Sequence, residues 1–293
     1  MKLAAAAYPL DALADWAAYE AKSREWVGAA AAAGADLLVF PEYGRMELAA
    51  FDGADVAGDL EASLAAAARW TGSADRLMED LAREHGVHIL APSGPVFDGG
   101  SRPVNRATFC GPAGKLGHQD KQVMTRFERE TWDVVPGGPL HVFDTGLGRV
   151  GVLICYDAEF PLLGRALAEA GAEILLVPSC TDALAGYSRV RVGAMARALE
   201  NQCVVVHAPT VCDAAWSPAV DENVGAAAIY GPPDLGFPPT GVIAEGELNA
   251  PGWVMAEVDP TAIARVRSHG AVLNHAHWPE SATRAQVLPR DID

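Results

Sequence analysis

Basic residues are scarce in this chain of 293 residues. Its 22 lysines and arginines stand against 38 aspartates and glutamates, and the formal net charge at pH 7 is -16. A surface with this balance repels the phosphate backbone of nucleic acids and the anionic face of a membrane. The composition therefore predicts that neither a nucleic acid nor a membrane is a partner.

Paired cysteines are also missing. The five cysteines form an odd set without a C-x-x-C spacing: Cys110, Cys155, Cys180, Cys203 and Cys212. Neither a disulfide framework nor a two-cysteine redox motif has this pattern. We expect five reduced thiols in a cytoplasmic protein.

Long hydrophobic runs are absent. The short apolar stretch at the start carries one lysine and is interrupted by Pro9 and Asp11. We therefore expect neither a secretory signal nor a membrane-spanning helix there. Aromatic residues make up only 7% of the chain, but half of all residues are hydrophobic and a fifth are charged, which is typical of a globular protein with a buried core.

The chain instead alternates helix-like and strand-like segments. Helical patterns cover 13–33, 161–170 and 189–201, and a further helical region ends near 84–86. Strand patterns cover 37–40, 87–91, 148–154, 173–178 and 203–207. Residues 105–111 and 115–120 flank a Gly-Pro-Ala-Gly turn, which predicts a hairpin. Alternation of this kind predicts an α/β fold.

The chain is expected to form one domain. The stretch 231–239 is rich in glycine and proline, but apolar strands are predicted on both sides of it, which favours an internal loop over a linker. No repeat of 20 to 50 residues is visible.

Three reactive side chains lie at the carboxyl ends of predicted strands. Glu42 follows strand 37–40, Lys121 follows the second hairpin strand, and Cys155 follows strand 148–154. Open α/β sheets gather their active sites at such ends. Taken singly, each residue also fits a structural role, as a surface carboxylate, a solvated cation or a small buried side chain. Their joint placement favours an active site.

Together these residues meet the needs of amide hydrolysis. Cys155 would supply the nucleophile, Lys121 would stabilise the oxyanion, and Glu42 would carry a proton to the leaving nitrogen. A thiol at a helix amino terminus near a lysine is expected to ionise more readily than a free thiol.

The segments around these residues resemble the nitrilase, or carbon–nitrogen hydrolase, superfamily, and its amidase-like branch in particular. The matching segments are 38–42, 118–121, 151–161 and 196–202, so the resemblance runs from near the start to at least Asp259. It implies a four-layer αββα sandwich and a Glu-Lys-Cys triad.

The resemblance also implies further site residues. A second glutamate would hold Lys121 and orient substrate or water. Glu128 is the preferred match, Glu130 is its competitor, and a helix-surface charge is the structural alternative. The backbone N–H of Tyr156 would be the second oxyanion donor.

The implied chemistry requires no cofactor. Cys155 would form a thioester with loss of ammonia or an amine, and water activated through Glu42 would hydrolyse it. His275 and His277 form a minimal metal pair, but two histidines near the end of the chain without a cysteine close by are weak evidence, so no metal site is expected.

By the same resemblance, the loop after the strand that follows the nucleophile shapes the substrate pocket. Tyr187 lies in this region. Asp182 could receive a cationic group, Arg189 or Arg191 could instead clamp a carboxylate, and a salt bridge among these residues is a third option.

The predicted substrate is a small-molecule amide. An aliphatic amidase, including an omega-amidase or a carbamoyl-amine hydrolase, is preferred over a nitrilase. An acyltransferase is disfavoured because such family members often span membranes, and no membrane-spanning segment is expected in this chain. Two alternatives come from other classes. A catalytically idle binding or scaffold protein with this fold would have no need of the triad. A thiol redox protein would need a resolving cysteine close to Cys155; none is close in the sequence, although Cys180 could approach Cys155 in space.

The resemblance further implies a homodimer or larger homo-oligomer. Residues 1–270 are expected to form the hydrolase domain, and residues 271–293 are expected to form a C-terminal tail that packs on a partner subunit.

Overall fold

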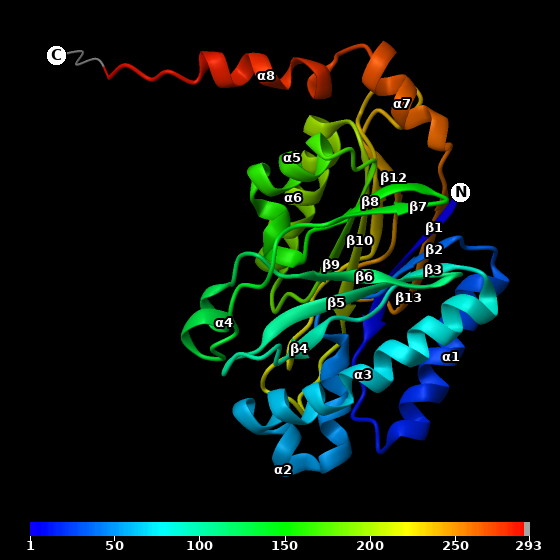
Figure 1. Ribbon diagram of the computed structural model, residues 1–293, viewed down its shortest axis with the longest axis vertical. Helices are drawn as coiled ribbons and strands as arrows, with labels where there is room; N and C mark the ends of the chain where they lie inside the picture. The colour runs from blue at the N-terminus through cyan, green and yellow to red at the C-terminus, as the bar shows by residue number, and fades with distance from the viewer. Residues whose placement is uncertain (290–293) are drawn as a thin grey trace.

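Strand β1 (Lys2–Pro9) occupies the middle of the sheet in the computed structural model, which describes residues 1–289 (Figure 1). The strand order is β4-β5-β3-β2-β1-β10-β9-β8-β7. The last four residues of the predicted C-terminal tail, 290–293, lie outside the described residues.

The sheet consists of two halves that meet at β1. The first half adds β2 (Leu37–Val39), β3 (His88–Leu90), β4 (Gly94–Val96), β5 (Val104–Gly111), β6 (Gly114–Asp120) and β13 (Gly252–Glu257). The second half contains β7 (Val142–Thr145), β8 (Gly148–Val152), β9 (Ile174–Ser179), β10 (Val204–Val211), β11 (Ala228–Tyr230) and β12 (Val242–Glu245). Only Tyr8 and Pro9 at the end of β1 pair with β10, opposite Thr210 and Val211.

Helices cover both outer faces, as Figure 1 shows. Helices α1 (Trp16–Ala32) and α3 (Leu60–His85) lie over the first half, and α5 (Pro161–Glu169) and α6 (Leu184–Asn201) lie over the second. The shorter elements are η1 (Gly44–Asp52), α2 (Ala54–Ala57), α4 (Arg126–Glu130), η2 (Cys155–Glu159), α7 (Pro260–His269) and α8 (Asn274–Arg284). This arrangement confirms the predicted single-domain αββα sandwich.

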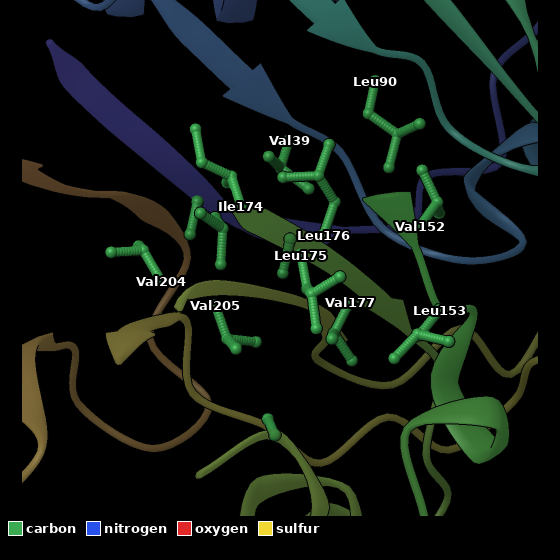
Figure 2. Close-up of a cluster of buried hydrophobic side chains, with 14 of the residues drawn as sticks. Val39, Leu90, Val152, Leu153, Ile174, Leu175, Leu176, Val177, Val204 and Val205 are labelled. Carbon is green, nitrogen blue, oxygen red and sulfur yellow. The ribbon is translucent and has the colours of Figure 1, made fainter. Parts of the chain in front are cut away.

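Aliphatic side chains fill the space between the two half-sheets. Val39 and Leu90 from the first half lie in one buried cluster with Val152, Leu176 and Val205 from the second (Figure 2). Strands covered on both faces need apolar residues at successive positions, which explains the apolar runs 174–178 of β9 and 204–206 of β10.

Strand β1 follows the same rule with smaller residues. Leu3, Ala5 and Ala7 belong to the cluster between the half-sheets, while Ala4 and Ala6 belong to the cluster under α1 and α3. This strand is not predicted from the sequence, because alanine favours strands weakly and the run is short. Tertiary packing on both faces overrides that weak preference.

The elements that the sequence predicts agree with the structure to within a few residues, except that α6 begins at Leu184, five residues earlier than expected. Strands β4, β7 and β13 and helices α7 and α8 are not predicted from the sequence. Helix α8 lies in the predicted tail and extends away from the body of the molecule (Figure 1), and none of its residues is buried. Within residues 1–289, every helix is too short or too polar to cross a membrane.

Leu176 tests the importance of the cluster between the half-sheets. It is fully buried there, so Leu176→Ala should leave a cavity and lower the free energy of unfolding by about 2–5 kcal/mol. Urea denaturation followed by circular dichroism measures the change. Leu235→Ala is the control because Leu235 is exposed, and an equal loss in both variants would contradict this view of the core.

Candidate active site

The three residues predicted at strand ends meet in one buried cluster. Glu42 follows β2, Lys121 follows β6, and Cys155 begins η2 after β8. The Nζ of Lys121 donates to Oε1 of Glu42 at 2.8 Å and to Oε2 of Glu128 at 2.7 Å. All four side chains are buried.

Glu42 is held by further donors. Its Oε1 accepts a hydrogen bond from Nδ2 of Asn105 at 2.9 Å, and its Oε2 accepts one from the backbone N–H of Cys180 at 2.9 Å. Burial raises the pKa of Glu42 to about 7, although Lys121 opposes the shift. A carboxyl group with a pKa near neutrality can both accept and return a proton.

The backbone of Cys155 has a left-handed φ of 51°, which is strained for a residue other than glycine. Its Sγ lies 3.8 Å from the carbonyl oxygen of Cys180. The turn packs closely on α6, where a Cβ at Gly193 would lie 2.7 Å from the carbonyl oxygen of Ala158. Glycine at that position therefore allows the nucleophile turn to approach the helix.

The sequence predicts that the Cys155 thiol ionises more readily than a free thiol, but its surroundings in the structure have the opposite effect. Burial and the nearby Glu42 carboxylate raise the pKa of the thiol well above its usual value, and Lys121 offsets only part of this shift. The element that begins at Cys155 is a 3₁₀ helix of five residues. The resting group is thus a neutral thiol, and its proton has to move to a base before or during attack.

Glu128 is fixed as an anion. Burial alone would raise its pKa, but the ion pair with Lys121 and hydrogen bonds from Tyr43 and Thr125 hold the pKa below its usual value. The Tyr43 hydroxyl donates to Oε1 at 2.7 Å, and the Thr125 backbone N–H donates to Oε2 at 2.8 Å in a capping box of α4. Glu130 instead pairs with Arg126 on the surface of α4.

Lys121 is correspondingly fixed as a cation. Burial by itself would lower its pKa, but Glu128 and Glu42 raise the pKa well above the usual value for lysine. A permanently charged ammonium group beside Cys155 can stabilise negative charge that develops on a substrate oxygen.

Asp157 is a positioning residue that the sequence analysis did not identify. Its Oδ1 accepts the backbone N–H of Val123 at 2.8 Å, and its Oδ2 accepts that of Ile154 at 3.2 Å. The carboxylate therefore ties the segment after Lys121 to the residue before Cys155. Its place in the matched segment 151–161, two residues after the nucleophile, was the available signal.

A cavity of about 600 Å³ opens onto these groups. Glu42, Lys121, Glu128, Cys155 and Tyr156 all line it. The volume is sufficient for a small organic substrate next to the thiol.

The predicted substrate residues separate into two groups. Asp182 and Arg189 line the cavity, and Nε of Arg189 lies 3.5 Å from Oε1 of Glu159. Tyr187 is not among the lining residues. Its hydroxyl donates instead to Glu245, 58 residues further along the chain, at 3.4 Å. Arg191 also pairs with Glu245, at 2.7 Å.

A second loop contributes to the cavity and was not identified from the sequence. Residues 218–222, between β10 and β11, line it together with the loop that carries Asp182. The loop is fastened to Thr181, whose Oγ1 donates to the carbonyl of Val224 at 2.7 Å and whose carbonyl accepts the Val224 N–H at 2.8 Å. These bonds connect positions 43 residues apart, so no local pattern could reveal them.

All five cysteines are free thiols in the structure. Cys180 lies in the cavity wall beside Cys155, and burial raises its pKa to about 12. Among residues 1–289, histidines, cysteines and acidic residues do not gather in any group of three or more that could hold a metal ion.

Comparison with known proteins identifies the relatives of this chain. A family model described as carbon–nitrogen hydrolase matches residues 2–268. The probable hydrolase YhcX of Bacillus subtilis is 33% identical over 249 residues, which are 84% of this chain and 47% of that protein. The deaminated glutathione amidase of Yersinia enterocolitica is 43% identical over 83 residues, which are 28% of this chain and 29% of that protein. The aligned part of this chain thus covers less than half the length of each of these two curated relatives.

A solved structure shows the same fold. A variant of an amidase from Nesterenkonia AN1, of the nitrilase superfamily, covers 97% of this chain with 96% of its own, at a TM-score of 0.68 and 22% identity. Another structure of that amidase shows covalent addition of the acetamide moiety of fluoroacetamide at its active-site cysteine. The resemblance drawn from the motifs and the predicted fold are confirmed.

Asp157→Asn tests the positioning role of Asp157. The amide offers one acceptor oxygen to backbone N–H groups that now share two, so we expect the free energy of unfolding to fall by about 1–3 kcal/mol. Hydrolytic activity should fall by more than the unfolded fraction of the variant accounts for, because Lys121 and Cys155 lose their common support. Asp144→Asn is the control, since that side chain is 82% exposed. Full activity in Asp157→Asn would contradict the role.

Proposed function

Because the chain belongs to the carbon–nitrogen hydrolase family, we propose that it hydrolyses a C–N bond of a small amide through a thioester on Cys155 and releases ammonia or an amine. The observation that carries this proposal is the Lys121 ammonium group held between Glu42 and Glu128 at the wall of the cavity that Cys155 lines. No cofactor is needed for this chemistry.

In the first step, the thiol transfers its proton to the Glu42 carboxylate as Sγ attacks the amide carbon. The raised pKa of Cys155 makes this base necessary, and the pKa of Glu42, about 7, makes it available. Attack produces a tetrahedral intermediate with negative charge on the former carbonyl oxygen.

Lys121 and the backbone N–H of Tyr156 are the proposed partners of this oxyanion. Lys121 is buried and keeps its charge, so its interaction with the oxygen is not weakened by water. Tyr156 follows the nucleophile directly and lines the cavity. Collapse of the intermediate then breaks the C–N bond as Glu42 returns the proton to the leaving nitrogen.

Water completes the reaction. Glu42 is a carboxylate again after the amine has left, and it accepts a proton from a water molecule that attacks the thioester. Collapse of the second tetrahedral intermediate releases a carboxylic acid and restores the thiol through the same carboxyl group. Glu128 stays ionised throughout and holds Lys121 in place.

An amide is preferred to a nitrile as substrate because amidases are among the relatives, including deaminated glutathione amidases and omega-amidase. The cytoplasm is the proposed location, since a catalytic thiol has to stay reduced. A homodimer or larger homo-oligomer is proposed as well, with the 271–293 tail, which includes α8, packed on the partner subunit. The exposed apolar residues Leu162 on α5 and Val192 on α6 support such an interface.

Intact-protein mass spectrometry with short amides, carbamoyl amines and nitriles tests the nucleophile. The wild-type protein should release ammonia or amine and form an acyl adduct that Cys155→Ala does not form. Lys121→Ala should be less stable than the wild type, because Glu42 and Glu128 lose their cation, but it should still fold. It should lose most activity, by about 10²–10³-fold, because the oxyanion loses a charged partner. Glu130→Gln is the control, since Glu130 lies on the surface of α4.

Two outcomes would count against this mechanism. Turnover by Cys155→Ala at the wild-type rate would exclude the nucleophile, and unchanged turnover by Lys121→Ala would exclude the oxyanion role. A wild-type protein that neither turns over nor binds covalently any substrate would favour an idle scaffold with this fold.

The pH dependence of kcat/KM tests Glu42. Only its carboxylate form can accept the thiol proton, so the rate should fall about tenfold per pH unit below the pKa of about 7 and reach a plateau above it. The high pKa of Lys121 keeps the ammonium group charged across the plateau. A rate that stays constant on acidification would contradict the assignment of Glu42 as the base.

A further inference from the structure

The charges that line the cavity are unbalanced. Its carboxylates are Glu42, Glu128, Glu159, Asp182, Asp221 and Glu222, and its cations are Lys121, Arg126 and Arg189. Each of the cations already has a carboxylate partner. Lys121 pairs with Glu42 and Glu128, Arg126 with Glu130 outside the cavity, and Arg189 with Glu159.

Glu159 is the acidic residue of this set that lies in the same turn as the nucleophile without belonging to the catalytic cluster. It ends η2, four residues after Cys155, and its side chain is only 20% exposed. Its ion pair with Arg189 is long, at 3.5 Å, and the arginine side chain is 62% exposed. Burial raises the pKa of Glu159 in spite of Arg189, so the carboxylate is poorly compensated.

Three of these carboxylates are exposed and form the rim of the cavity. Asp182 comes from the loop between β9 and α6, and Asp221 and Glu222 come from the loop between β10 and β11. Across the described residues 1–289, none of these three side chains takes part in an ion pair. A mouth with this charge draws cations inward and repels anions.

We propose that the cavity selects amides whose acyl chain ends in a cation, such as an ammonium or guanidinium group, and that Glu159 determines this specificity by pairing with that cation. The inference rests on the proposed function, because it names the substrate class of the same site. Asp182, Asp221 and Glu222 attract the substrate electrostatically before it binds.

An anionic substrate is the competing possibility, and it would use Arg189. The described contacts favour the cation. A substrate carboxylate would have to pass three unpaired acidic groups and then take Arg189 from Glu159, which would leave a largely buried carboxylate without a partner.

Matched substrates separate these possibilities. The test measures kcat/KM, from ammonia release, for ω-amino amides of three to six carbons, for alkyl amides of the same length, and for amides with a terminal carboxylate. We expect the best ω-amino amide to exceed its alkyl counterpart by about 10- to 100-fold, the range for a hydrogen bond to a charged group. Added salt should reduce the advantage, because it screens the rim.

Three variants locate the recognition. Glu159→Gln should lose about 10- to 100-fold in kcat/KM for the ω-amino amide and less than about threefold for the alkyl amide. Glu159→Asp should recover part of the loss. Arg189→Gln should keep or increase the preference for the cation, because it removes a competing partner. Glu25→Gln is the matched control, since Glu25 is exposed on α1.

Several results would overturn this inference. The first is equal or better turnover of the alkyl or carboxylate amides. The second is an equal loss for all substrates in Glu159→Gln, which would indicate a structural role. The third is an Arg189→Gln variant that behaves like Glu159→Gln, which would mean that Glu159 acts only by holding the arginine. If no substrate releases ammonia or forms an adduct on Cys155, the proposed function fails as well.

Discussion

An ammonium group held between two carboxylates in a buried pocket is the interaction on which this site depends. Lys121 donates to both Glu42 and Glu128, and all three side chains are almost completely removed from solvent. An unpaired charge at this depth would be strongly unfavourable, and the two carboxylates would repel each other without the lysine. Glu42 follows β2, Lys121 follows β6 and Glu128 lies in α4, so the ion pairs also fix how these elements meet.

The same cluster gives its two carboxylates different chemistry. Glu128 receives hydrogen bonds from Tyr43 and Thr125 in addition to Lys121, and these donors keep its pKa low. Burial prevails at Glu42 and raises its pKa to about 7. One carboxylate is therefore a fixed charge and the other is suited to transfer protons, although a single lysine touches both.

Chemistry and selectivity come from different parts of the fold. The reacting groups lie at strand ends and are supported by buried bonds such as those of Asp157. The rim is formed by two loops that Thr181 fastens together. Exposed loops can change their charges without disturbing the sandwich, whereas a change in the buried cluster alters packing and ionisation together. A cationic substrate preference set by Glu159 would lie between these two layers, because Glu159 is part of the nucleophile turn.

The sequence by itself determined an α/β fold and the strand ends on which Glu42, Lys121 and Cys155 lie, because these depend on local hydrophobic patterns. The αββα sandwich followed from its motifs, through their resemblance to the carbon–nitrogen hydrolase family. Only the tertiary structure identified β1 as the central strand, assigned Asp157 its positioning role and brought loop 218–222 to the cavity. Only it decided that Cys155 rests as a neutral thiol and that Tyr187 points away from the cavity. Burial and contacts between residues far apart in the chain decide these features, and neither is encoded in a local pattern.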